Sequence, residues 1–586
     1  MICLKLLEAF ISHGLKYVVL CPGSRSGPLA LAAARLSEIS DLTLITSLDE
    51  RSGAYLALGI GTSTGNACAV ITTSGTAVAN LLPASIEADR SCQPLLLITA
   101  DRPWRLKECG SNQTVNQEDF LASVCRLVQQ GPHEGIHLYS EKIIKDVVEK
   151  SWENAHRFPG PVHLNLSIDE PLHPSLKEQQ EILSEWEPAF KQIKPKTTDS
   201  LKEDYIESSN LFPCIDFSRP GVVLVGPWRG KSDQLTSFNK YLRKFQLMSK
   251  WPIFADPLSG LEEDLNGLIG NWELLIEAGI PLPKKGLQVL RLGPIPASRI
   301  IESWLLSLGG QQIVITEGDA RCLDPFGISK QWSHGFVTWY EKLSQNLNFS
   351  RDDSQKISNE FLKACNKYDQ IACKWLDKNL PLKGFITEPS LAKWIPTLLP
   401  SGLPVMLSAS SPVRDWISYA GKKSLARRCF SFRGASGIDG TLSLAMGITI
   451  AEGKSVLITG DLALLHDTNG WLFDKPNSPE LLIILIDNGG GGIFTRLQIE
   501  EFNKGDVEKL FLMPQSVTPF DIAKSYGVPC RQASSLEDFE SAIEWGLSFT
   551  RTALIRVCAS PYKDNKLRKD LCEGFKNHFQ MMIQNE

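Results

Sequence analysis

Hydrophobic residues in the first third of the chain gather in short runs, with Ala-rich or polar segments between them. Runs of this length without strict polar alternation are typical of strands that are buried on both faces of a parallel sheet. The segments 28–36 and 54–58 suit helices that cover such a sheet. The pattern predicts strands at 17–21, 42–47, 68–72 and 94–100, with a further helix opening at 73–76.

The last third of the chain shows the same rhythm of strand and helix, and the middle third shows it more weakly. In the middle third, each apolar run leads into Gly or Pro, which is typical of strands that end in turns. The strands predicted for these two regions are 221–226, 287–293, 311–317, 405–408, 429–432, 455–459 and 481–486. The fold class predicted for the chain is therefore α/β, built from doubly wound parallel sheets.

A chain of 586 residues is too long for a single hydrophobic core. Residues 175–210 are rich in Lys, Glu, Gln and Pro and poor in strand signal, so we expect a linker there, and a second polar stretch covers 346–359. These shifts predict three domains, at 1–180, 181–355 and 356–586.

Composition narrows the class of protein. Hydrophobic residues make up 43% and charged residues 22%, as in an ordinary globular protein, and the net charge of −5 argues against general nucleic-acid binding. The longest apolar runs are far too short to cross a bilayer. Residues 1–10 have a Lys and a Glu among their apolar residues, so we interpret them as a first helix and not as a signal peptide. We expect a cytoplasmic protein.

The 14 cysteines are scattered along the chain, without Cys-x-x-Cys pairs and without Cys/His clusters at zinc spacing. Cys21, Cys68, Cys92 and Cys429 have apolar neighbours in the sequence. We expect free thiols in a reducing compartment.

Two polar motifs follow predicted strands in the last third. Gly460–Asp461–Leu462 follows one strand, and Asp487–Asn488–Gly489–Gly490 follows the next. Asp461 and Asn488 are 27 residues apart, about one strand–helix–strand crossover, which places neighbouring strand ends side by side. Two hard oxygen ligands beside a Gly-rich turn suit a magnesium ion that holds a diphosphate. The pair is similar to the GDG…NN signature of thiamine-diphosphate enzymes, although Asp, Asn and Gly also collect at strand ends for backbone reasons.

Glu50 strengthens the metal hypothesis. It lies at the end of a predicted strand and the start of a helix, where an acid can also serve simply to face the helix dipole. Thiamine chemistry needs one well-placed carboxylate against the aminopyrimidine ring, because that contact promotes loss of the thiazolium proton. A strand-end Glu in the first domain and a metal motif in the last form the expected two-part layout.

A Gly-rich segment at 433–440 surrounds Ile438. Glycines let the backbone approach a ligand closely, and a bulky residue among them can hold two cofactor rings in a bent conformation. Ordinary core packing is the alternative interpretation for Ile438.

Several arginines stand at predicted strand ends or in loops, the edge where open α/β sheets bind ligands. A guanidinium suits a carboxylate, so a set of them implies a substrate with more than one carboxylate, whereas most surface arginines are only solvated. The set comprises Arg25, Arg102, Arg299, Arg414 and Arg433.

Taken together, these motifs and the segments around them resemble one family, the 2-succinyl-5-enolpyruvyl-6-hydroxy-3-cyclohexene-1-carboxylate (SEPHCHC) synthases, which are thiamine-diphosphate-dependent. Within that family, GDL in place of GDG is typical, so Leu462 is not a departure. The matching blocks cover the first and last thirds well and the middle thinly: 21–34, 49–59, 73–88, 95–103, 109–117, 432–440, 459–467 and 487–494.

The resemblance implies roles for individual residues. Glu50 would act on the aminopyrimidine ring, and Asp461, Asn488 and the carbonyl of Gly490 would bind Mg²⁺, with Mn²⁺ as an alternative ion. The other residues implied to bind the cofactor are Ile438, Gly460, Leu462, Ile493 and Phe494. The residues implied to bind substrate are Ser24, Arg25, Arg102, Gln113, Arg299, Ser410, Arg414, Arg433, Ile493, Phe494 and Leu497, of which Ser410, Arg414 and Arg433 would join Glu50 in catalysis.

The resemblance also implies a reaction. The enzyme would be a transferase that decarboxylates 2-oxoglutarate and adds the resulting succinic-semialdehyde carbanion to isochorismate, in menaquinone or phylloquinone biosynthesis. It further implies pyrimidine-binding, central and diphosphate-binding domains, and an active site between the subunits of a homodimer or a dimer of dimers. Rival interpretations are another thiamine-diphosphate carboligase or decarboxylase such as acetohydroxyacid synthase, a catalytically silent regulatory subunit, and a nucleotide-binding module.

Overall fold

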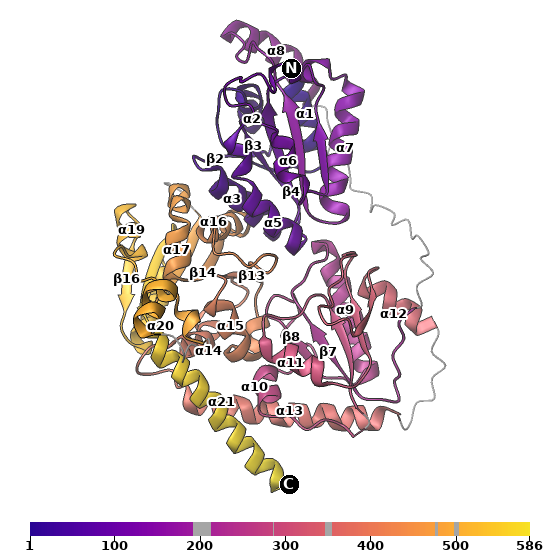
Figure 1. The fold of residues 1–586 in the computed structure, drawn as a ribbon, viewed down its shortest axis with the longest axis vertical. Coiled ribbons are helices and arrows are strands. Elements are labelled where there is room, and N and C mark those ends of the chain that lie inside the picture. Colours follow the sequence, from indigo (N-terminus) through magenta and orange to yellow (C-terminus); the bar gives the residue numbers. More distant parts are fainter. Residues whose placement is uncertain (191–211, 285, 346–353, 475–478, 497–502, 586) are drawn as a thin grey trace. The chain divides into compact units, whose positions relative to one another are not determined.

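The structure is a computed structural model, and it describes residues 1–190, 212–284, 286–345, 354–474, 479–496 and 503–585. The chain divides into two compact units (Figure 1). Unit 1 contains the described parts of residues 1–208, 432–453 and 466–479, and unit 2 contains those of 209–431, 454–465 and 480–586. The three sheets are parallel throughout, so the predicted α/β class is confirmed.

Unit 1 is built around a six-stranded sheet in the order β2-β1-β3-β4-β6-β5. The central strands β3, β4 and β6 are buried along their whole length, as expected for a parallel sheet that is covered on both faces. The strands are β1 Tyr17–Leu20, β2 Thr43–Thr46, β3 Cys68–Thr72, β4 Leu95–Asp101, β5 Leu127–Gln130 and β6 Pro161–Ser167.

Helices surround this sheet and bury their apolar sides against it. Those from the first 190 residues are α1 Ile2–Ser12, α2 Gly27–Ile39, α3 Glu50–Thr64, α4 Thr76–Ala79, α5 Leu82–Ser91, α6 Gln117–Ala122, α7 Glu141–Arg157 and α8 Leu176–Phe190, with short 3₁₀ turns η1 Trp104–Leu106 and η2 Ile136–Leu138. Two elements from late in the sequence also belong to unit 1, namely α16 Thr441–Glu452 and η5 Thr468–Phe473.

Helices α3 and α16 approach each other closely because a glycine stands at the contact on each side. A Cβ atom on Gly59 would overlap the carbonyl oxygen of Leu444, and one on Gly447 would overlap that of Leu56. The two glycines therefore bring the helix that begins at Glu50 directly against the helix that follows the 433–440 segment.

Unit 2 contains the other two sheets. The middle sheet has the order β11-β10-β9-β7-β8, from β7 Gly221–Val225, β8 Ile253–Ala255, β9 Gln288–Leu292, β10 Gln312–Ile315 and β11 Ser329–Trp332. Its helices are η3 Ser232–Gln234, α9 Leu235–Ser249, α10 Trp272–Glu277, α11 Arg299–Ser307 and α12 Phe336–Gln345.

The last sheet has the order β13-β12-β14-β15-β17-β16. Its strands are β12 Val405–Leu407, β13 Cys429–Ser431, β14 Lys454–Gly460, β15 Glu480–Asp487, β16 Cys530–Ala533 and β17 Ala553–Cys558. The remaining helices of unit 2 are α13 Ser354–Asn379, α14 Glu388–Leu398, α15 Ser411–Tyr419, η4 Gly421–Leu425, α17 Asp461–His466, η6 Gly492–Arg496, α18 Lys504–Val507, η7 Glu508–Leu512, α19 Pro519–Ser525, α20 Leu536–Leu547 and α21 Pro561–Gln584. Of these, α13 and α21 bury apolar residues in the core of the middle sheet. Counted along the chain, the first and last sheets have the same strand order.

The predicted linker is wrong over part of its length. Residues 176–190 form helix α8, which buries Trp186 in the core of unit 1 and packs Ile182 and Leu183 beside it. The indole Nε1 of Trp186 also donates a hydrogen bond to Glu8. The polar residues that suggested a linker are the solvent side of an amphipathic helix, and the remainder of the predicted linker lies outside the described residues.

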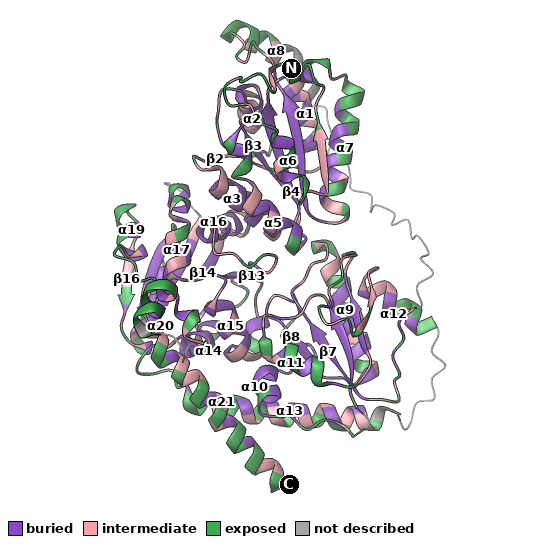
Figure 2. Cartoon of the chain, in the orientation of Figure 1, coloured by how far each residue is buried: buried purple, intermediate pink, exposed green. Residues whose placement is uncertain are grey.

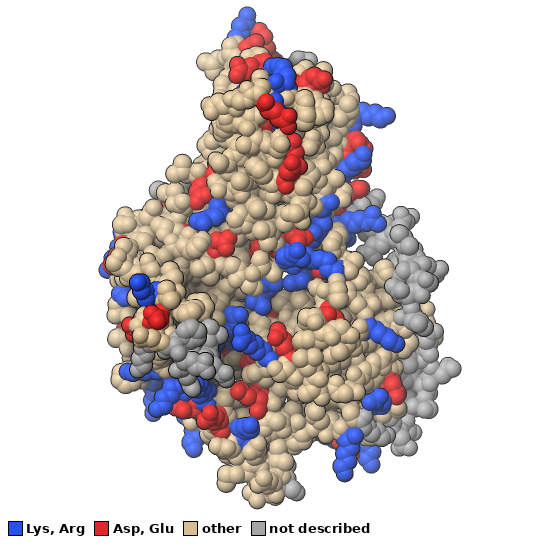
Figure 3. All heavy atoms as spheres, viewed as in Figure 1, with Lys and Arg blue, Asp and Glu red and all other residues tan. Residues whose placement is uncertain are grey.

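The predicted strands are otherwise confirmed within one or two residues, and 1–10 forms α1 as expected. Within each unit, Figure 2 shows buried strands inside and helices with exposed outer sides. All 14 cysteines lie in the described ranges as free thiols. No described helix combines the length and the apolar character needed to cross a membrane. On the face drawn in Figure 3, acidic and basic side chains are interspersed.

Candidate functional site

The carboxyl ends of β14 and β15 bring the Asp461 and Asn488 motifs together. The two strands pair in parallel, with Gly460 opposite Ile486, so Asp461 and Asp487 follow at the same edge of the sheet. Asp461 begins helix α17, and Asn488 opens the turn after β15. The crossover predicted from the spacing of these residues is therefore the one observed.

Asp461 is a buried carboxylate held by backbone N–H groups. Its Oδ1 accepts a hydrogen bond from the N–H of Leu462 at 2.8 Å, and only 6% of the residue is exposed. Burial raises the pKa of Asp461 to about 6, and the neighbouring charge of Asp487 adds to that rise, whereas the N–H groups of Leu462 and Gly490 act against it. A cation at this position would stabilise the ionised form.

The side chain of Asn488 has two unlike ends. Its Nδ2 donates to Glu388 Oε1 at 2.7 Å. Its Oδ1 is buried and accepts no hydrogen bond from any of the described residues. A buried oxygen without a partner is a costly arrangement, so this atom is the strongest sign of an open ligand position at the edge of the sheet.

The turn after Asn488 depends on glycine. Gly490 has φ +134°, and a Cβ atom there would overlap the carbonyl oxygen of Leu512. The carbonyl of Gly490 accepts the N–H of Gly492 at 2.9 Å and keeps a second lone pair. Ile493 and Phe494 follow in η6, where the ring of Phe494 lies 5.6 Å from that of Phe511. Leu497, a predicted apolar wall of the pocket, lies outside the described residues.

A buried ionic network lies behind Asn488, and sequence reasoning missed it. Glu388 begins α14 and is paired with Arg568 of α21, which also binds Asp415 of α15 with Nε 3.0 Å from Oδ1. Arg496 reaches Asp415 at 2.7 Å. Both arginines hold the pKa of Asp415 below its usual value despite complete burial. A fifth member, Asp564, is buried beside Glu388, and burial raises its pKa to about 7.

Among the described residues, no group of three or more His, Cys, Asp or Glu side chains is arranged to hold a metal ion. The oxygens at this edge come instead from one carboxylate, one amide and one backbone carbonyl. Such a set suits a hard cation that takes its remaining ligands from a phosphate group and from water.

In unit 1, Glu50 stands at the first turn of α3, after the Asp49 cap. Its Oε2 accepts a hydrogen bond from Asn80 Nδ2 at 3.2 Å, and the residue is half-buried. Asp49 Oδ1 accepts the N–H of Arg51 at 2.9 Å, which fixes the start of the helix. The predicted strand-end position of Glu50 is therefore observed, with Asn80 as a partner that the sequence did not reveal.

The structure brings four of the predicted substrate residues to one edge of the first sheet: Ser24, Arg25, Arg102 and Gln113. Buried Arg25 donates to the carbonyl of Ile168 at 2.9 Å, and Arg102 donates to that of Gln113 at 2.6 Å. Partial burial and then the positive charge of Arg25 lower the pKa of Arg102. Two mutually repelling guanidinium groups beside each other would be stabilised by an anionic ligand. Ser24 is exposed in the turn that leads to α2.

Ser410 has an unusual backbone. It precedes α15 with φ +78° and ψ −132°, a region that L residues rarely adopt, and its carbonyl accepts a bond from Arg414 Nη1 at 2.7 Å. Gly75, before α4 in the first sheet, has nearly the same angles, φ +86° and ψ −137°. A serine kept where glycine is usual points to a functional constraint.

The segment 433–440, which carries Arg433 and Ile438, is held by a carboxylate that the sequence did not single out. Buried Glu87 of α5 accepts the backbone N–H groups of Gly434 at 2.7 Å, Ala435 at 2.6 Å and Ser436 at 3.2 Å. Burial raises the pKa of Glu87, and these N–H groups oppose the rise. Arg433 Nη1 also contacts Ser436 Oγ at 3.2 Å, so the cradle on Glu87 fixes the segment around both predicted residues.

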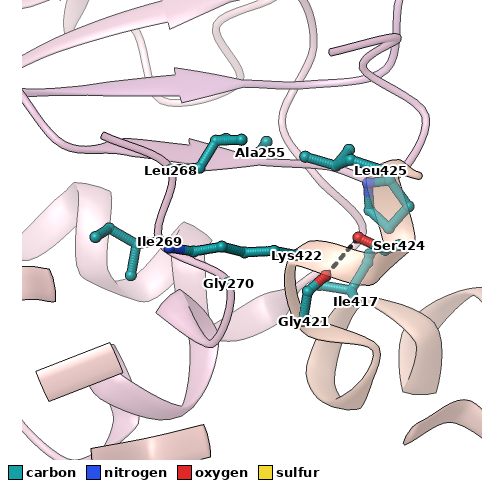
Figure 4. Close-up of a pocket in the computed structure, with 10 residues that line it drawn as sticks. Ala255, Leu268, Ile269, Gly270, Ile417, Gly421, Lys422, Ser424 and Leu425 are labelled. Atoms are coloured by element: carbon teal, nitrogen blue, oxygen red, sulfur yellow. Dashed lines mark hydrogen bonds between the residues drawn. The ribbon is translucent and has the colours of Figure 1, made fainter. Parts of the chain in front are cut away.

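Two small hollows border the middle sheet. A hollow at the ends of β7, β9 and β10 has a volume of about 20 Å³. A second hollow, beside η4, has a volume of about 10 Å³ and is drawn in Figure 4. These volumes suit a single water molecule at most. In Figure 4, the aliphatic chain of Lys422 lies across the hollow between Ile269 and Gly421. Arg299, the predicted middle-domain contact, is exposed at the first turn of α11, after a Ser298 cap.

The candidate residues therefore form two sets, one in each unit. Unit 1 carries Ser24, Arg25, Glu50, Arg102, Gln113, Arg433 and Ile438. Unit 2 carries Arg299, Ser410, Arg414, Gly460, Asp461, Leu462, Asn488, Gly490, Ile493 and Phe494.

Comparison with known proteins adds a second line of information. Residues 5–122 match the family described as thiamine pyrophosphate enzyme, N-terminal TPP binding domain, and residues 415–557 match the corresponding C-terminal TPP binding domain. These two ranges include Glu50 and the Asp461 and Asn488 motifs respectively.

Curated relatives match over nearly the whole chain. A 2-succinyl-5-enolpyruvyl-6-hydroxy-3-cyclohexene-1-carboxylate synthase of Prochlorococcus marinus (strain MIT 9313) is 52% identical over 576 residues, covering 98% of this chain and 99% of the relative. Proteins of the same name from Synechococcus sp. are 50% identical (strain WH7803, 96% of each chain) and 48% identical (strain CC9902, 97% of this chain and 99% of the relative).

Proposed function

Because the chain belongs to the 2-succinyl-5-enolpyruvyl-6-hydroxy-3-cyclohexene-1-carboxylate (SEPHCHC) synthase family of thiamine-diphosphate enzymes, we propose that it decarboxylates 2-oxoglutarate and joins the remaining four-carbon unit to isochorismate. Carbon dioxide and SEPHCHC are the products, in menaquinone or phylloquinone biosynthesis. The observation that carries the proposal is identity of about half the residues over nearly the full length of a relative with that name.

The residues of unit 2 fit a metal-bound diphosphate. Asn488 Oδ1 is buried without a hydrogen-bond donor among the described residues, and the buried Asp461 carboxylate has a raised pKa that a cation would lower. We assign Asp461, Asn488 and the Gly490 carbonyl to Mg²⁺, or Mn²⁺ in its place. Gly460 and Leu462 flank Asp461, and Ile493 and Phe494 flank the turn. When bound, thiamine diphosphate supplies the carbanion chemistry that removal of carbon dioxide from a 2-oxo acid requires.

Glu50 is assigned to the proton that must move on the aminopyrimidine ring. Asn80 holds one carboxylate oxygen in place, and the N-terminus of α3 keeps the group where an anion is favoured. A fixed carboxylate can accept and return a proton without reorganising, which is what general acid–base catalysis needs. Ile438 is assigned to support of the bent cofactor.

The arginines are assigned to the carboxylates of the two substrates, both of which are dicarboxylic acids. Arg25 and Arg102, with Ser24 and Gln113, offer one cationic edge. Arg414, held by the strained Ser410, and Arg433, on the segment that Glu87 cradles, offer further guanidinium groups. Arg299 and Leu497 complete the proposed set. Charged donors of this kind orient a carboxylate and lower the free energy of its binding.

We also propose pyrimidine-binding, central and diphosphate-binding domains at 1–180, 181–355 and 356–586, and in support each range contains one parallel sheet. Helix α8 crosses the first of these boundaries and packs in the core of the first sheet. A homodimer or dimer of dimers in the cytoplasm, with each site shared by two subunits, is part of the same proposal.

The decisive experiment compares substrates on the purified protein with Mg²⁺ and thiamine diphosphate. We expect carbon dioxide release from 2-oxoglutarate and formation of SEPHCHC only when isochorismate is present. Release of carbon dioxide from pyruvate, with none from 2-oxoglutarate, would instead indicate an acetohydroxyacid-synthase-like enzyme. A protein that binds the cofactor and turns over neither substrate would indicate a silent subunit.

A further inference from the structure

The two ends of the Asn488 side chain are chemically distinct, and only one end is engaged. Nδ2 donates to Glu388 Oε1 at 2.7 Å, and Oδ1 is buried without a donor in the described part of the chain. We propose that Glu388 is a positioning residue that selects the end of Asn488 that faces the metal ion. This inference rests on the proposed function, because it assumes that Asn488 is a metal ligand.

The chemistry of the pair allows one orientation of the amide. An ionised carboxylate only accepts hydrogen bonds, so it binds the NH₂ group of an amide and repels its oxygen. With Nδ2 on Glu388, the Oδ1 atom must face the other way. A rotation of the amide by half a turn would set two oxygens against each other and present N–H donors to the cation.

Glu388 is built into the fold as a fixed acceptor. It is the first residue of α14, where Thr387 caps the helix, and only 3% of it is exposed. Its own N–H donates to Asp564 Oδ2 at 3.3 Å. Its second oxygen is occupied by Arg568, so the oxygen that faces Asn488 cannot turn away without breaking an ion pair.

Arg568 makes a buried carboxylate tolerable at this position. A charge at 3% exposure is costly unless it is paired, and Arg568 binds both Glu388 and Asp415. Arg496, at the end of the turn that begins with Asn488, binds Asp415 at 2.7 Å and lies 4.0 Å from Glu388. The turn is therefore fastened at both ends to the same network, which includes the C-terminal helix α21.

A positioning role predicts an effect on metal affinity that exceeds the effect on folding. Partners of metal ligands commonly contribute about 10–100-fold to metal affinity, because they fix the orientation of the ligand. A merely structural Glu388 would change the stability of the protein without cofactor and leave Mg²⁺ affinity unchanged once folded. Calorimetric titration of Mg²⁺ in the presence of thiamine diphosphate separates the two.

The test reverses the hydrogen bond. In Glu388→Gln, we expect the new amide oxygen to turn to Arg568, so that the new NH₂ group faces Asn488 and rotates that side chain. In Asn488→Asp, two carboxylates face each other. Each single variant should weaken Mg²⁺ binding by about 10–100-fold. In the double variant, the amide at position 388 donates to one oxygen of the carboxylate at position 488 and leaves the other oxygen for the metal. The Mg²⁺ affinity should then return to within about tenfold of wild type.

Lys454 and Glu480 provide the matched control, because they pair at 3.0 Å at the opposite ends of the same two strands. Glu480→Gln should leave Mg²⁺ affinity unchanged. If Glu388→Gln does not fold, the comparison of Asn488→Asp with the double variant carries the test, since these differ only at residue 388. A double variant that binds Mg²⁺ no more tightly than Asn488→Asp, or that does not fold, overturns the proposal. Absence of Mg²⁺-dependent cofactor binding in wild type would instead contradict the proposed function.

Discussion

The first and last sheets have the same strand order, yet two buried carboxylates beside each sheet, all near the candidate residues, are held by different kinds of partner. Beside the first sheet, Glu87 and Asp467 are held by neutral donors, namely backbone N–H groups and serine hydroxyls. Beside the last sheet, Glu388 and Asp415 are held by arginines. Burial raises the pKa of Asp467 in spite of these donors, whereas the two arginines hold the pKa of Asp415 below its usual value.

This difference shows how one topology can support two kinds of site. In unit 1, neutral donors hold Glu87 and Asp467. The arginines of the proposed substrate site are therefore not needed to balance the charge of these two carboxylates. In unit 2, arginines balance the charges of Glu388, Asp415 and Asp487, so that the carboxylate of Asp461 remains at the sheet edge for a cation. The same strand order thus supports proposed substrate residues beside the first sheet, and a proposed metal site with further substrate residues beside the last.

The largest expected effect is at Glu50. Glu50→Gln should lower kcat/KM by about 10²–10⁴-fold, because it removes the carboxylate that moves the proton. The melting temperature should change little, since among the described residues the half-buried side chain accepts a hydrogen bond from Asn80 alone. Steady-state kinetics and thermal unfolding check both points. Glu38→Gln, at an exposed ion pair with Arg35, is the control, and unchanged turnover in Glu50→Gln would refute the assignment.

The pH dependence of stability should reveal the effect of burial on Asp467. Burial raises its pKa to about 6, so the folded protein binds this proton more tightly than the unfolded chain does. Stability from this group is therefore lost as pH rises from about 4 to about 6, by about 1.4 kcal/mol per pH unit. Asp467→Asn removes that loss. As pH rises from about 4 to about 6, we expect the unfolding free energy of the variant to increase relative to that of the wild type. Denaturant titrations at each pH measure this difference.

The same denaturant titrations on Asp415→Asn test the contrasting carboxylate beside the last sheet. Asp415→Asn should show no such gain between about pH 4 and 6, because its lowered pKa keeps it ionised in both states through most of that range. A gain of the same size in both variants would remove the difference between the two regions.

The cradle on Glu87 should have a smaller effect. Glu87→Gln replaces an acceptor of three N–H groups by one that also carries a donor, and should lower the free energy of unfolding by about 1.5–3 kcal/mol. Because the segment carries Arg433, KM for the substrates should also rise. Denaturant titration and steady-state kinetics measure these changes. Glu149→Gln, on the exposed side of α7, is the control, and a stable variant with an unchanged KM would contradict the cradle's role.

The smallest expected effect concerns the matching backbones of Gly75 and Ser410. Ser410→Gly should raise the free energy of unfolding by about 1 kcal/mol, because it removes a strained conformation, and should lower activity. Gly75→Ser should lower the free energy of unfolding, since a Cβ atom would lie 2.9 Å from Gln113 Cγ and the backbone angles would be strained. Thermal unfolding of both variants decides this, and a destabilised Ser410→Gly would show that the serine hydroxyl outweighs the strain.

Sequence reasoning finds the residues whose signals are local. Asp461 and Asn488 each stand beside glycine after an apolar strand, and Glu50 stands at a strand-to-helix turn. Strands with an internal polar pattern escape such reasoning, as in β6, where His163 and Asn165 are buried and bound to Thr99. Helix α8 resembles a linker in sequence because its apolar side is narrow.

Glu388, Asp415, Arg568 and Glu87 could not be found in this way. Glu388 and Asn488 are 100 residues apart, and Glu87 and Gly434 are 347 apart. Each of these side chains is an ordinary charged residue on a helix, with no motif around it. Only the fold gives it a partner.

The sequence by itself determined the parallel sheets, the loops at their carboxyl ends and the chemical types of the candidate ligands, because these depend on short-range patterns of apolar runs, glycines and polar residues. The tertiary structure decided how those ligands are held. It set Glu388 against one end of Asn488, Glu87 under the 433–440 segment and arginines around Asp415. Hydrogen bonds and ion pairs between distant segments form only after the chain has folded, so their geometry leaves no local trace in the sequence.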